Sequence, residues 1–302
     1  SFCAARSSMR LDQSADTTFS GPGPLEKRLV RERSHYLRDS RSMSIHEKGL
    51  SRRSFLAAAL GGGVLGLTRN VAAAKADRSA FDPRLTARPQ RPTRTPAIGL
   101  SHFGESLLRG GLLYVPESYD PATPAPLIVA LHGSGGQAQS WSRLFDECEA
   151  RGLVLMASDS RDRTWDRVHG DFGPDVGFID SALRYTFDRC VIDPAQVALA
   201  GFSDGASYAL SLGPSNGDLF THLIAWSPGF SSPADPIVGM PRVFVSHGTA
   251  DNVLPVTLSR VIIVPTFDMD GYSVEYAEFD GRHEMPSAIV TQSLDWFLSG
   301  RD

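Results

Sequence analysis

The chain has 302 residues, of which 41% are hydrophobic and 21% are charged, and its formal net charge at pH 7 is −4. This length allows a substantial buried core, and the slight acidic excess argues against a nucleic-acid partner. No stretch has the ~20 consecutive apolar residues of a membrane-spanning helix, and the three cysteines lack the spacing of a structural zinc site.

The first 42 residues do not have the pattern of a folded domain. Residues 1–42 are polar, rich in arginine and serine, and without apolar periodicity. We expect them to be disordered, or to be translated sequence upstream of the true start. Met43 is then the candidate initiator, because the segment after it has the parts of an export signal.

Residues 43–76 are interpreted as a signal peptide. Arg52 and Arg53 precede a short apolar run, which small residues follow up to candidate cleavage sites at Ala74 or Ala76. The stretch SRRSFL resembles the twin-arginine export motif, although an alanine stands where a lysine is common. We therefore expect the twin-arginine export machinery as a partner and a periplasmic or secreted location. The alternative is an amphipathic or buried helix with two chance arginines.

The pattern changes at about residue 100. Residues 77–99 are rich in proline, arginine and threonine, which predicts a flexible linker. In residues 100–302, apolar runs of strand length alternate with helical periodicity, as in an α/β domain whose mostly parallel sheet has helices on both faces. A hairpin turning at Gly110–Gly111 comes first. Predicted strands then cover 126–133, 153–159, 196–203, 222–228, 242–248 and 273–279, and predicted helices cover roughly 138–151, 175–187, the segment after 203, 259–271 and 286–300.

Ser203 is the candidate nucleophile. It lies in the pattern Gly201-x-Ser203-x-Gly205, directly after a predicted strand and directly before a helical pattern. A sharp strand-to-helix turn exposes the hydroxyl near the positive end of the helix, and the glycines leave room for that turn. Ligands of such sheets bind beyond the carboxyl ends of the strands, where Ser203 lies. The alternative is a small residue in a tight turn.

A serine nucleophile needs a base, and the base needs an acid that orients it. Asp251 follows one predicted strand and His283 follows the next, which is the order of acid and histidine that this strand-to-helix serine motif requires. We therefore predict Asp251 as the acid and His283 as the base. His247 precedes the acid and is interpreted as structural, whereas Asp280 and Glu284 are rival acids.

The glycine-rich stretch HGSGG, residues 132–136, follows another predicted strand. Acyl transfer builds negative charge on a carbonyl oxygen, and two fixed backbone N–H groups there lower the barrier. We predict these donors to be the backbone amides of Ser134 and Asp204, since glycines let the backbone approach a substrate closely. The alternative is an ordinary strand-to-helix loop.

Four stretches, LHGSGG, GFSDGASYAL, HGTADNVLPV and GRHEMP, together resemble the phospholipase/carboxylesterase family of the α/β-hydrolase superfamily. This group includes acyl-protein thioesterases and bacterial serine esterases, and polyhydroxybutyrate depolymerase-like esterases are close relatives. The resemblance covers nearly all of the predicted domain and implies an α/β-hydrolase fold. It also implies Ser203 as nucleophile, Asp251 as acid, His283 as base, and the amides of Ser134 and Asp204 as oxyanion donors.

Two further features bear on the substrate. The segment between the strands at 222–228 and 242–248 is too short for a helical cap, which favours short-chain, water-soluble or surface-exposed esters. The loop SRDRTWD follows a strand end and makes Trp165 and Arg163 candidate substrate-binding residues. The alternative for this loop is a surface segment anchored by a packed tryptophan.

The predicted function is an exported serine esterase that hydrolyses small-molecule or polymer-linked carboxylic esters through an acyl-enzyme. A polymer-ester hydrolase, polyhydroxybutyrate depolymerase-like or feruloyl esterase-like, is the alternative, and a catalytically silent binding protein is a remote one. No metal, nucleotide or redox cofactor is expected, because the three side chains supply the chemistry. Cys148 and Cys190 are expected to be free if their helices cover opposite faces of the sheet.

Overall fold

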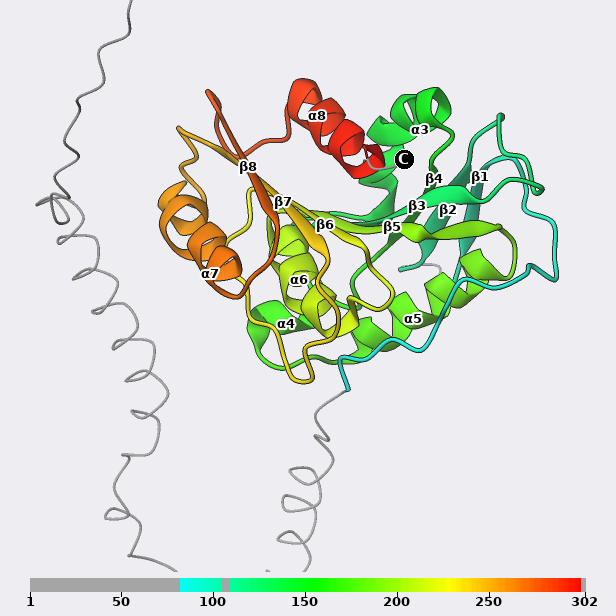
Figure 1. Ribbon diagram of the computed structural model, residues 1–302, viewed down its shortest axis with the longest axis horizontal. Helices are drawn as coiled ribbons and strands as arrows, with labels where there is room; N and C mark the ends of the chain where they lie inside the picture. Colours follow the sequence, from blue (N-terminus) through cyan, green and yellow to red (C-terminus); the bar gives the residue numbers. More distant parts are fainter. Residues whose placement is uncertain (1–81, 105–108, 300–302) are drawn as a thin grey trace, which may run out of the picture. The chain divides into compact units, whose positions relative to one another are not determined.

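The computed structural model describes residues 82–104 and 109–299, in which eight strands form one sheet (Figure 1). The strand order is β1-β2-β4-β3-β5-β6-β7-β8, with β1, β2 and β4 joined antiparallel and the other neighbours parallel. The mostly parallel sheet is thus confirmed. The predicted upstream segment 1–42 and signal peptide 43–76 lie outside the described residues. The strands are β1 Gly99–Phe103, β2 Gly111–Val115, β3 Ala125–Leu131, β4 Val154–Ser158, β5 Ile192–Phe202, β6 His222–Trp226, β7 Arg242–Gly248 and β8 Val274–Phe279.

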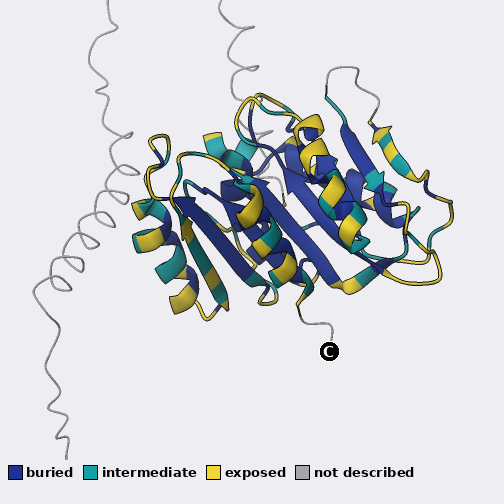
Figure 2. Cartoon of the chain, turned by 90° about the horizontal axis from the view of Figure 1, so that it is seen from above, coloured by how far each residue is buried: buried dark blue, intermediate teal, exposed yellow. Residues whose placement is uncertain are grey.

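Helices cover both faces of the sheet. Two core layers result, one beneath η2, α3 and α8 and the other beneath α5, α6 and α7 (Figure 1). Because both faces are covered, every residue of β3, β4 and β6 is buried, as their continuous apolar runs predict (Figure 2). Cys148 lies in the first layer and Cys190 in the second, and both are free. The helices are η2 Ala138–Leu144, α3 Phe145–Arg151, α4 Asp166–His169, α5 Pro174–Phe187, α6 Asp204–Leu212, η3 Gly213–Asn216, η4 Leu258–Ile263, α7 Val264–Met269 and α8 Ser287–Leu298.

The hairpin at the start of the sheet differs from its prediction. The predicted turn at Gly110–Gly111 is wrong, because β2 begins at Gly111, which pairs with Phe103 of β1. The connection between the two strands therefore lies within residues 104–110. A Cβ at Gly111 would come within 2.3 Å of the Phe103 ring, so this glycine permits close packing inside the hairpin instead of forming its turn.

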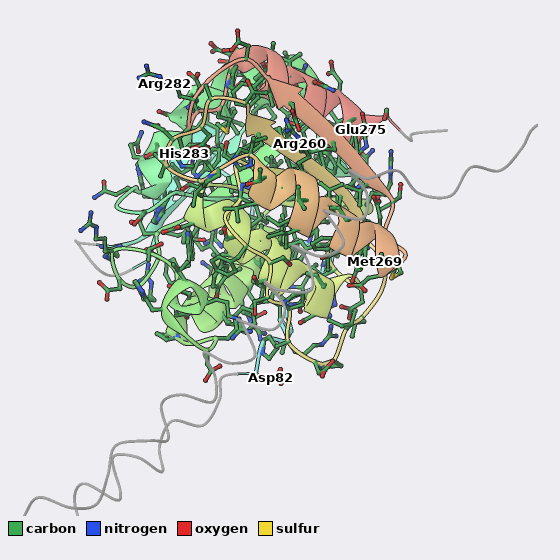
Figure 3. All side chains as sticks on the ribbon, turned by 90° about the vertical axis from the view of Figure 1, so that its left-hand side faces the viewer. Asp82, Arg260, Met269, Glu275, Arg282 and His283 are labelled. Carbon is green, nitrogen blue, oxygen red and sulfur yellow. The ribbon has the colours of Figure 1, made fainter. Side chains whose placement is uncertain are left out.

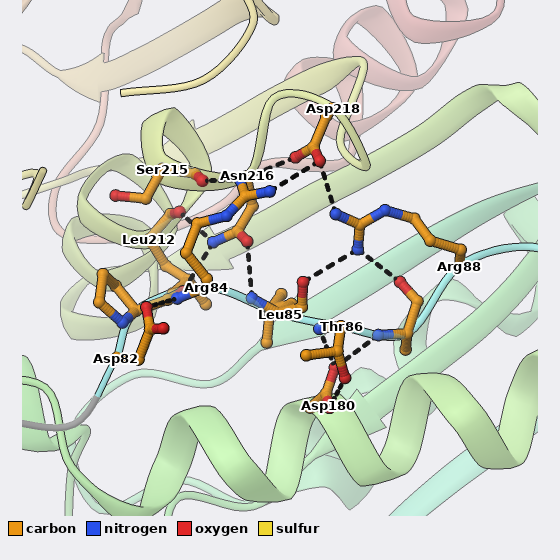
Figure 4. Close-up of polar contacts among 12 residues, drawn as sticks. Asp82, Arg84, Leu85, Thr86, Arg88, Asp180, Leu212, Ser215, Asn216 and Asp218 are labelled. Atoms are coloured by element: carbon orange, nitrogen blue, oxygen red, sulfur yellow. Dashed lines mark hydrogen bonds and ion pairs between the residues drawn. The ribbon is translucent and has the colours of Figure 1, made fainter. Parts of the chain in front are cut away.

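Residues 82–98 form a strap that runs across the domain, and over this stretch the prediction of a flexible linker is wrong. Leu85 and Ala87 are buried to 2% and 3% exposure. The side chain of Asn216 accepts a hydrogen bond from the Leu85 amide at 2.8 Å and donates one to the Pro83 carbonyl at 2.9 Å (Figure 4). The strap lacks periodicity because side chains of the domain, and not a strand ladder, hold its backbone.

Two carboxylates of the domain also bind the strap. Asp180 of α5 accepts hydrogen bonds from the amides of Thr86 and Ala87 at 2.7 and 2.8 Å. Asp218 forms ion pairs with both Arg84 and Arg88 of the strap (Figure 4). The strap therefore joins α5 to the end of the α6–η3 segment.

Among the described residues, the connection between β6 and β7 forms no cap over the carboxyl ends of the parallel strands. Residues 227–241, between β6 and β7, contain no helix or strand. The short connection therefore leaves this edge open, as its length predicts. Among the helices that the structure describes, none has the length and apolar character needed to cross a membrane.

Candidate active site

Ser203 occupies the sharp turn between β5 and α6. Its backbone has φ 56° and ψ −119°, a left-handed conformation that is strained for a residue with a side chain. A Cβ at Gly201 would lie 2.2 Å from the carbonyl oxygen of Gly205, and one at Gly205 would lie 2.1 Å from the carbonyl oxygen of Leu131. No side chain fits at either position, because the backbone of another segment lies directly against each glycine.

Two hydrogen bonds join Ser203 to the predicted histidine and acid. His283 Nε2 lies 2.8 Å from Ser203 Oγ, and His283 Nδ1 lies 2.6 Å from Asp251 Oδ2. A carboxylate only accepts, so in the neutral imidazole Nδ1–H donates to Asp251 and Nε2 accepts from the serine hydroxyl. Ser203 and Asp251 are nearly buried, whereas His283 keeps 14% of its side chain exposed at the upper edge of the domain (Figure 3).

The loops that carry the acid and the histidine are bound to each other. The amides of Thr249 and Ala250 donate to the carbonyls of Phe279 and Gly281, each at 2.9 Å. Gly248 permits this approach, since a Cβ there would meet a backbone carbonyl at 2.2 Å. The Nδ1 atom of His283 pairs with Asp251 and not with either rival acid: Asp280 is exposed, and Glu284 accepts from the Arg282 amide at 3.0 Å.

Asp251 is held as an anion inside the protein. Burial alone would raise its pKa, but hydrogen bonds from His283 and from the amides of Leu254 and Val253 outweigh burial and lower the pKa. His247 is fully buried, with Nε2 2.7 Å from the carbonyl oxygen of Leu254 and 3.3 Å from Asp251 Oδ2. Burial lowers the pKa of His247, which keeps this second imidazole neutral. The histidine predicted to be structural thus also touches the acid.

Several solved structures of proteins named esterases have the same fold. A thermostable esterase matches with a TM-score of 0.53 and 20% identity, over 66% of this chain and 62% of that one. A butyrate-bound esterase from the Planctomycetes species Thermogutta terrifontis matches with a TM-score of 0.52 and 18% identity, over 67% of this chain and 94% of its own. The chain has the α/β-hydrolase fold.

Several sequence relatives of this chain are named esterases. Feruloyl esterase C of Emericella nidulans is 28% identical over 188 residues, which are 58% of this chain and 66% of that protein. Feruloyl esterase B of Thermothelomyces thermophilus is 33% identical over 119 residues, 36% of this chain and 40% of that protein. The chain therefore spans less than two thirds of these relatives' lengths. No protein-family model matches it.

The glycine-rich loop is braced beside Ser203. His132 Nε2 accepts from the Ser160 amide at 3.0 Å, so Nδ1–H donates to the Gly133 carbonyl at 2.7 Å. Burial lowers the pKa of His132, which favours this neutral form. Within the described residues, the amides of Ser134 and Asp204 have no hydrogen-bond partner, although those of Gly135 and Gly136 do. Both predicted donors are therefore unoccupied.

Trp165 does not line a substrate pocket, and that prediction is wrong. Its side chain is fully buried, packs against the rings of His132 and Tyr208, and donates from Nε1 to the His132 carbonyl at 2.8 Å. The packed-tryptophan alternative is therefore correct. Arg163 is exposed, and its carbonyl accepts from the Gly135 amide at 2.8 Å. The pocket role of the Arg163 side chain stays a prediction.

A cavity beside Ser203 was missed by the sequence reasoning. Its volume is about 280 Å³, and the glycine-rich loop forms one wall. The other lining side chains include Trp141, Arg143, Phe202 and Met285. Phe202 directly precedes Ser203 and Met285 lies two residues after His283 in the sequence, but Trp141 and Arg143 belong to η2 and reach the site only through the fold.

Proposed function

We propose that this chain is a serine esterase that hydrolyses carboxylic esters through an acyl-enzyme. The observation that carries the proposal is the hydrogen-bonded sequence of Ser203 Oγ, His283 and Asp251 at the carboxyl edge of the sheet, with contacts of 2.8 and 2.6 Å. The esterase names of the relatives support the same reaction class.

Acylation begins when Ser203 Oγ attacks the ester carbonyl carbon while His283 Nε2 takes the hydroxyl proton. Asp251 stabilises the imidazolium, and the free amides of Ser134 and Asp204 stabilise the negative charge on the carbonyl oxygen. The intermediate collapses when the carbon–oxygen bond to the alcohol breaks and His283 returns its proton to the leaving oxygen. The acyl group then remains on Ser203.

Deacylation repeats these steps with water as the nucleophile. His283 takes a proton from the water as its oxygen attacks the acyl carbon, and the bond to Ser203 Oγ breaks. The proton passes from His283 to the serine, and the carboxylic acid leaves. No group beyond the three side chains and the two amides is needed for the proton balance.

The test is the Ser203→Ala variant, assayed on p-nitrophenyl acetate and butyrate. We expect kcat to fall by roughly 10⁴-fold or more, because removing one member of such a unit removes nearly all of its effect. A fluorophosphonate probe should label the wild-type protein on the peptide that contains Ser203. Retained turnover in the variant, or label on another residue, would refute the assignment.

A feruloyl or polymer-linked ester is the second candidate substrate class. Two of the sequence relatives are named feruloyl esterases, and the connection between β6 and β7 forms no cap; both observations favour this class. Release of ferulate from feruloylated xylan, compared with clearing of polyhydroxybutyrate and with hydrolysis of p-nitrophenyl butyrate, separates these possibilities. Turnover of any of these esters excludes the alternative that the chain is a catalytically silent binding protein.

Export by the twin-arginine machinery is part of the proposal and is supported by the sequence around Arg52 and Arg53. Replacing both with lysine should keep the full-length protein in the cytoplasm, whereas the wild type should appear in the periplasm or medium in a shortened form. Equal export of both proteins would contradict this route.

A further inference from the structure

We propose that the cavity beside Ser203 binds one arm of the ester, and that it selects a flat apolar arm carrying an acidic group at its far end. Arg143 is the residue that would recognise this acidic group. The inference rests on the proposed function and deepens it, because it concerns which ester the same site takes.

The position of the cavity relative to the reacting atoms supports this role. Gly133 lines the cavity and lies next to the nucleophile, since a Cβ on this residue would be 3.3 Å from Ser203 Cβ. The ring of Phe202 lines the cavity and also packs on the His283 imidazole, with 4.9 Å between their centroids. An ester bound at Ser203 would therefore extend one of its arms into this space.

The size and lining of the cavity indicate a flat apolar arm. A cavity of about 150 Å³ accommodates benzene, so about 280 Å³ leaves room for one aromatic ring and a short chain. Trp141 and Phe202 offer ring surfaces, and Met285 offers a polarisable thioether that contacts aromatic groups favourably. Trp141 is fixed by its contact with Trp226, at 5.8 Å between ring centroids.

Arg143 adds a positive charge to a cavity whose lining also includes His132, Ser134 and Ser140 beside its apolar side chains. Its Nη2 donates to the carbonyl of Met285 at 2.9 Å, which holds the exposed guanidinium over the cavity. Within the part of the chain that the structure describes, no carboxylate forms an ion pair with Arg143. The remaining donors of this guanidinium suit a carboxylate or phenolate on the ligand.

Two pairs of matched esters test the proposal, one for each arm. The acyl pair is methyl 3-(4-carboxyphenyl)propanoate and methyl 3-(4-methylphenyl)propanoate, and the alcohol pair is 4-carboxybenzyl acetate and 4-methylbenzyl acetate. The measured quantity is the ratio of kcat/KM for the acidic member to that for the neutral member. We expect a ratio above one in one pair, which Arg143→Gln lowers about three- to tenfold and Arg143→Lys lowers less.

Arg282→Gln is the matched control, because it removes an equal charge from an exposed residue next to His283 that does not line the cavity (Figure 3). This variant should keep the wild-type ratio. A wild-type ratio near one in both pairs, or an equal loss in both variants, overturns the role of Arg143. If the wild type hydrolyses no ester and takes up no fluorophosphonate, the proposed function itself fails, which is a different result.

Discussion

Ser259 determines the hydrogen-bonding state of the second histidine. The Leu254 carbonyl can only accept, so His247 Nε2 must carry the proton and His247 Nδ1 must accept from the Ser259 hydroxyl, 2.7 Å away. Ser259 and His247 are both fully buried, and the Nε2–H of His247 also faces Asp251. A hydroxyl on η4 thus fixes the proton of an imidazole that touches the predicted acid Asp251.

Replacing Ser259 with alanine should leave Nδ1 of His247 without a partner. We expect the free energy of unfolding, measured by urea denaturation, to fall by about 1–3 kcal/mol, which is typical of an unsatisfied buried polar group. Thr257→Ala is the control, because Thr257 is exposed and its side chain caps nothing. Equal stability of the two variants would show that the Ser259 hydroxyl does not hold His247.

Gly205, two residues after the predicted nucleophile Ser203, should not tolerate even a methyl group. In Gly205→Ala the new Cβ would lie 2.1 Å from the Leu131 carbonyl oxygen, which belongs to the sheet and cannot move aside cheaply. We expect a loss of several kcal/mol or failure to fold, seen as a lower Tm or as insoluble protein. Gly177→Ala in α5 meets nothing within 4 Å and should instead raise stability by roughly 0.5–1 kcal/mol. A wild-type Tm in Gly205→Ala would contradict the packing described for this turn.

The strap shows how an element without regular structure is stabilised. Its apolar anchor is Leu85, and its backbone is satisfied by Asn216 and Asp180 from two different helical segments. The ion pairs that Asp218 forms with the strap make the stability of this region depend on pH. The hydrogen bond from Arg84 lowers the pKa of Asp218 to about 2, so this contribution to stability is full above about pH 4 and is lost as the pH falls toward 2.

Leu85→Ala tests whether the strap is part of the folded domain in solution. Truncating a buried leucine should lower the free energy of unfolding by about 2–4 kcal/mol, measured by chemical denaturation. Gln90→Ala, at an exposed position of the same strap, should change it by less than about 0.5 kcal/mol. If both variants match the wild type, residues 82–98 behave as the flexible linker that their composition predicts.

The stability of the whole molecule should depend on the charge state of His222, which begins β6 in the layer beneath α8. Burial lowers its pKa to about 4, and its ring packs edge-on against Trp296 and Phe297. Between about pH 4 and 6.5 the unfolded chain binds a proton at this residue that the folded chain does not. Stability is therefore lost as the pH falls through this window.

Replacing His222 with phenylalanine or leucine should flatten this pH dependence. We expect the drop in free energy of unfolding between pH 7 and 5 to be roughly 2 kcal/mol smaller in either variant than in the wild type. His169→Gln removes an exposed histidine and should keep the full drop. The comparison uses the pH dependence and not the absolute stability, so a change in packing does not obscure it. Identical slopes in wild type and His222 variants would show that His222 is not responsible.

Strand order along the chain and the positions of polar residues after strands were enough to predict the fold class. They also predicted that Ser203, Asp251 and His283 would meet, because parallel strands bring their carboxyl ends to one edge. Contacts between distant segments were not predictable in this way. Trp165 lies in a polar loop of the sequence but packs beneath the glycine-rich loop, and Arg143 lines the cavity from η2, far in the sequence from the Met285 carbonyl to which it donates a hydrogen bond.

The strap has a consequence for how the protein is handled. Asp82, the first described residue, lies at the opposite end of the domain from His283 (Figure 3). If the chain were shortened to begin at Asp82, a resin, surface or fusion partner attached there would therefore lie at the far end of the domain from the predicted catalytic residue His283. Because Leu85 and Asn216 anchor the strap a few residues later, such an attachment pulls on a fixed point and not on the reaction site. Immobilised preparations oriented in this way should keep their access to bulky or insoluble esters.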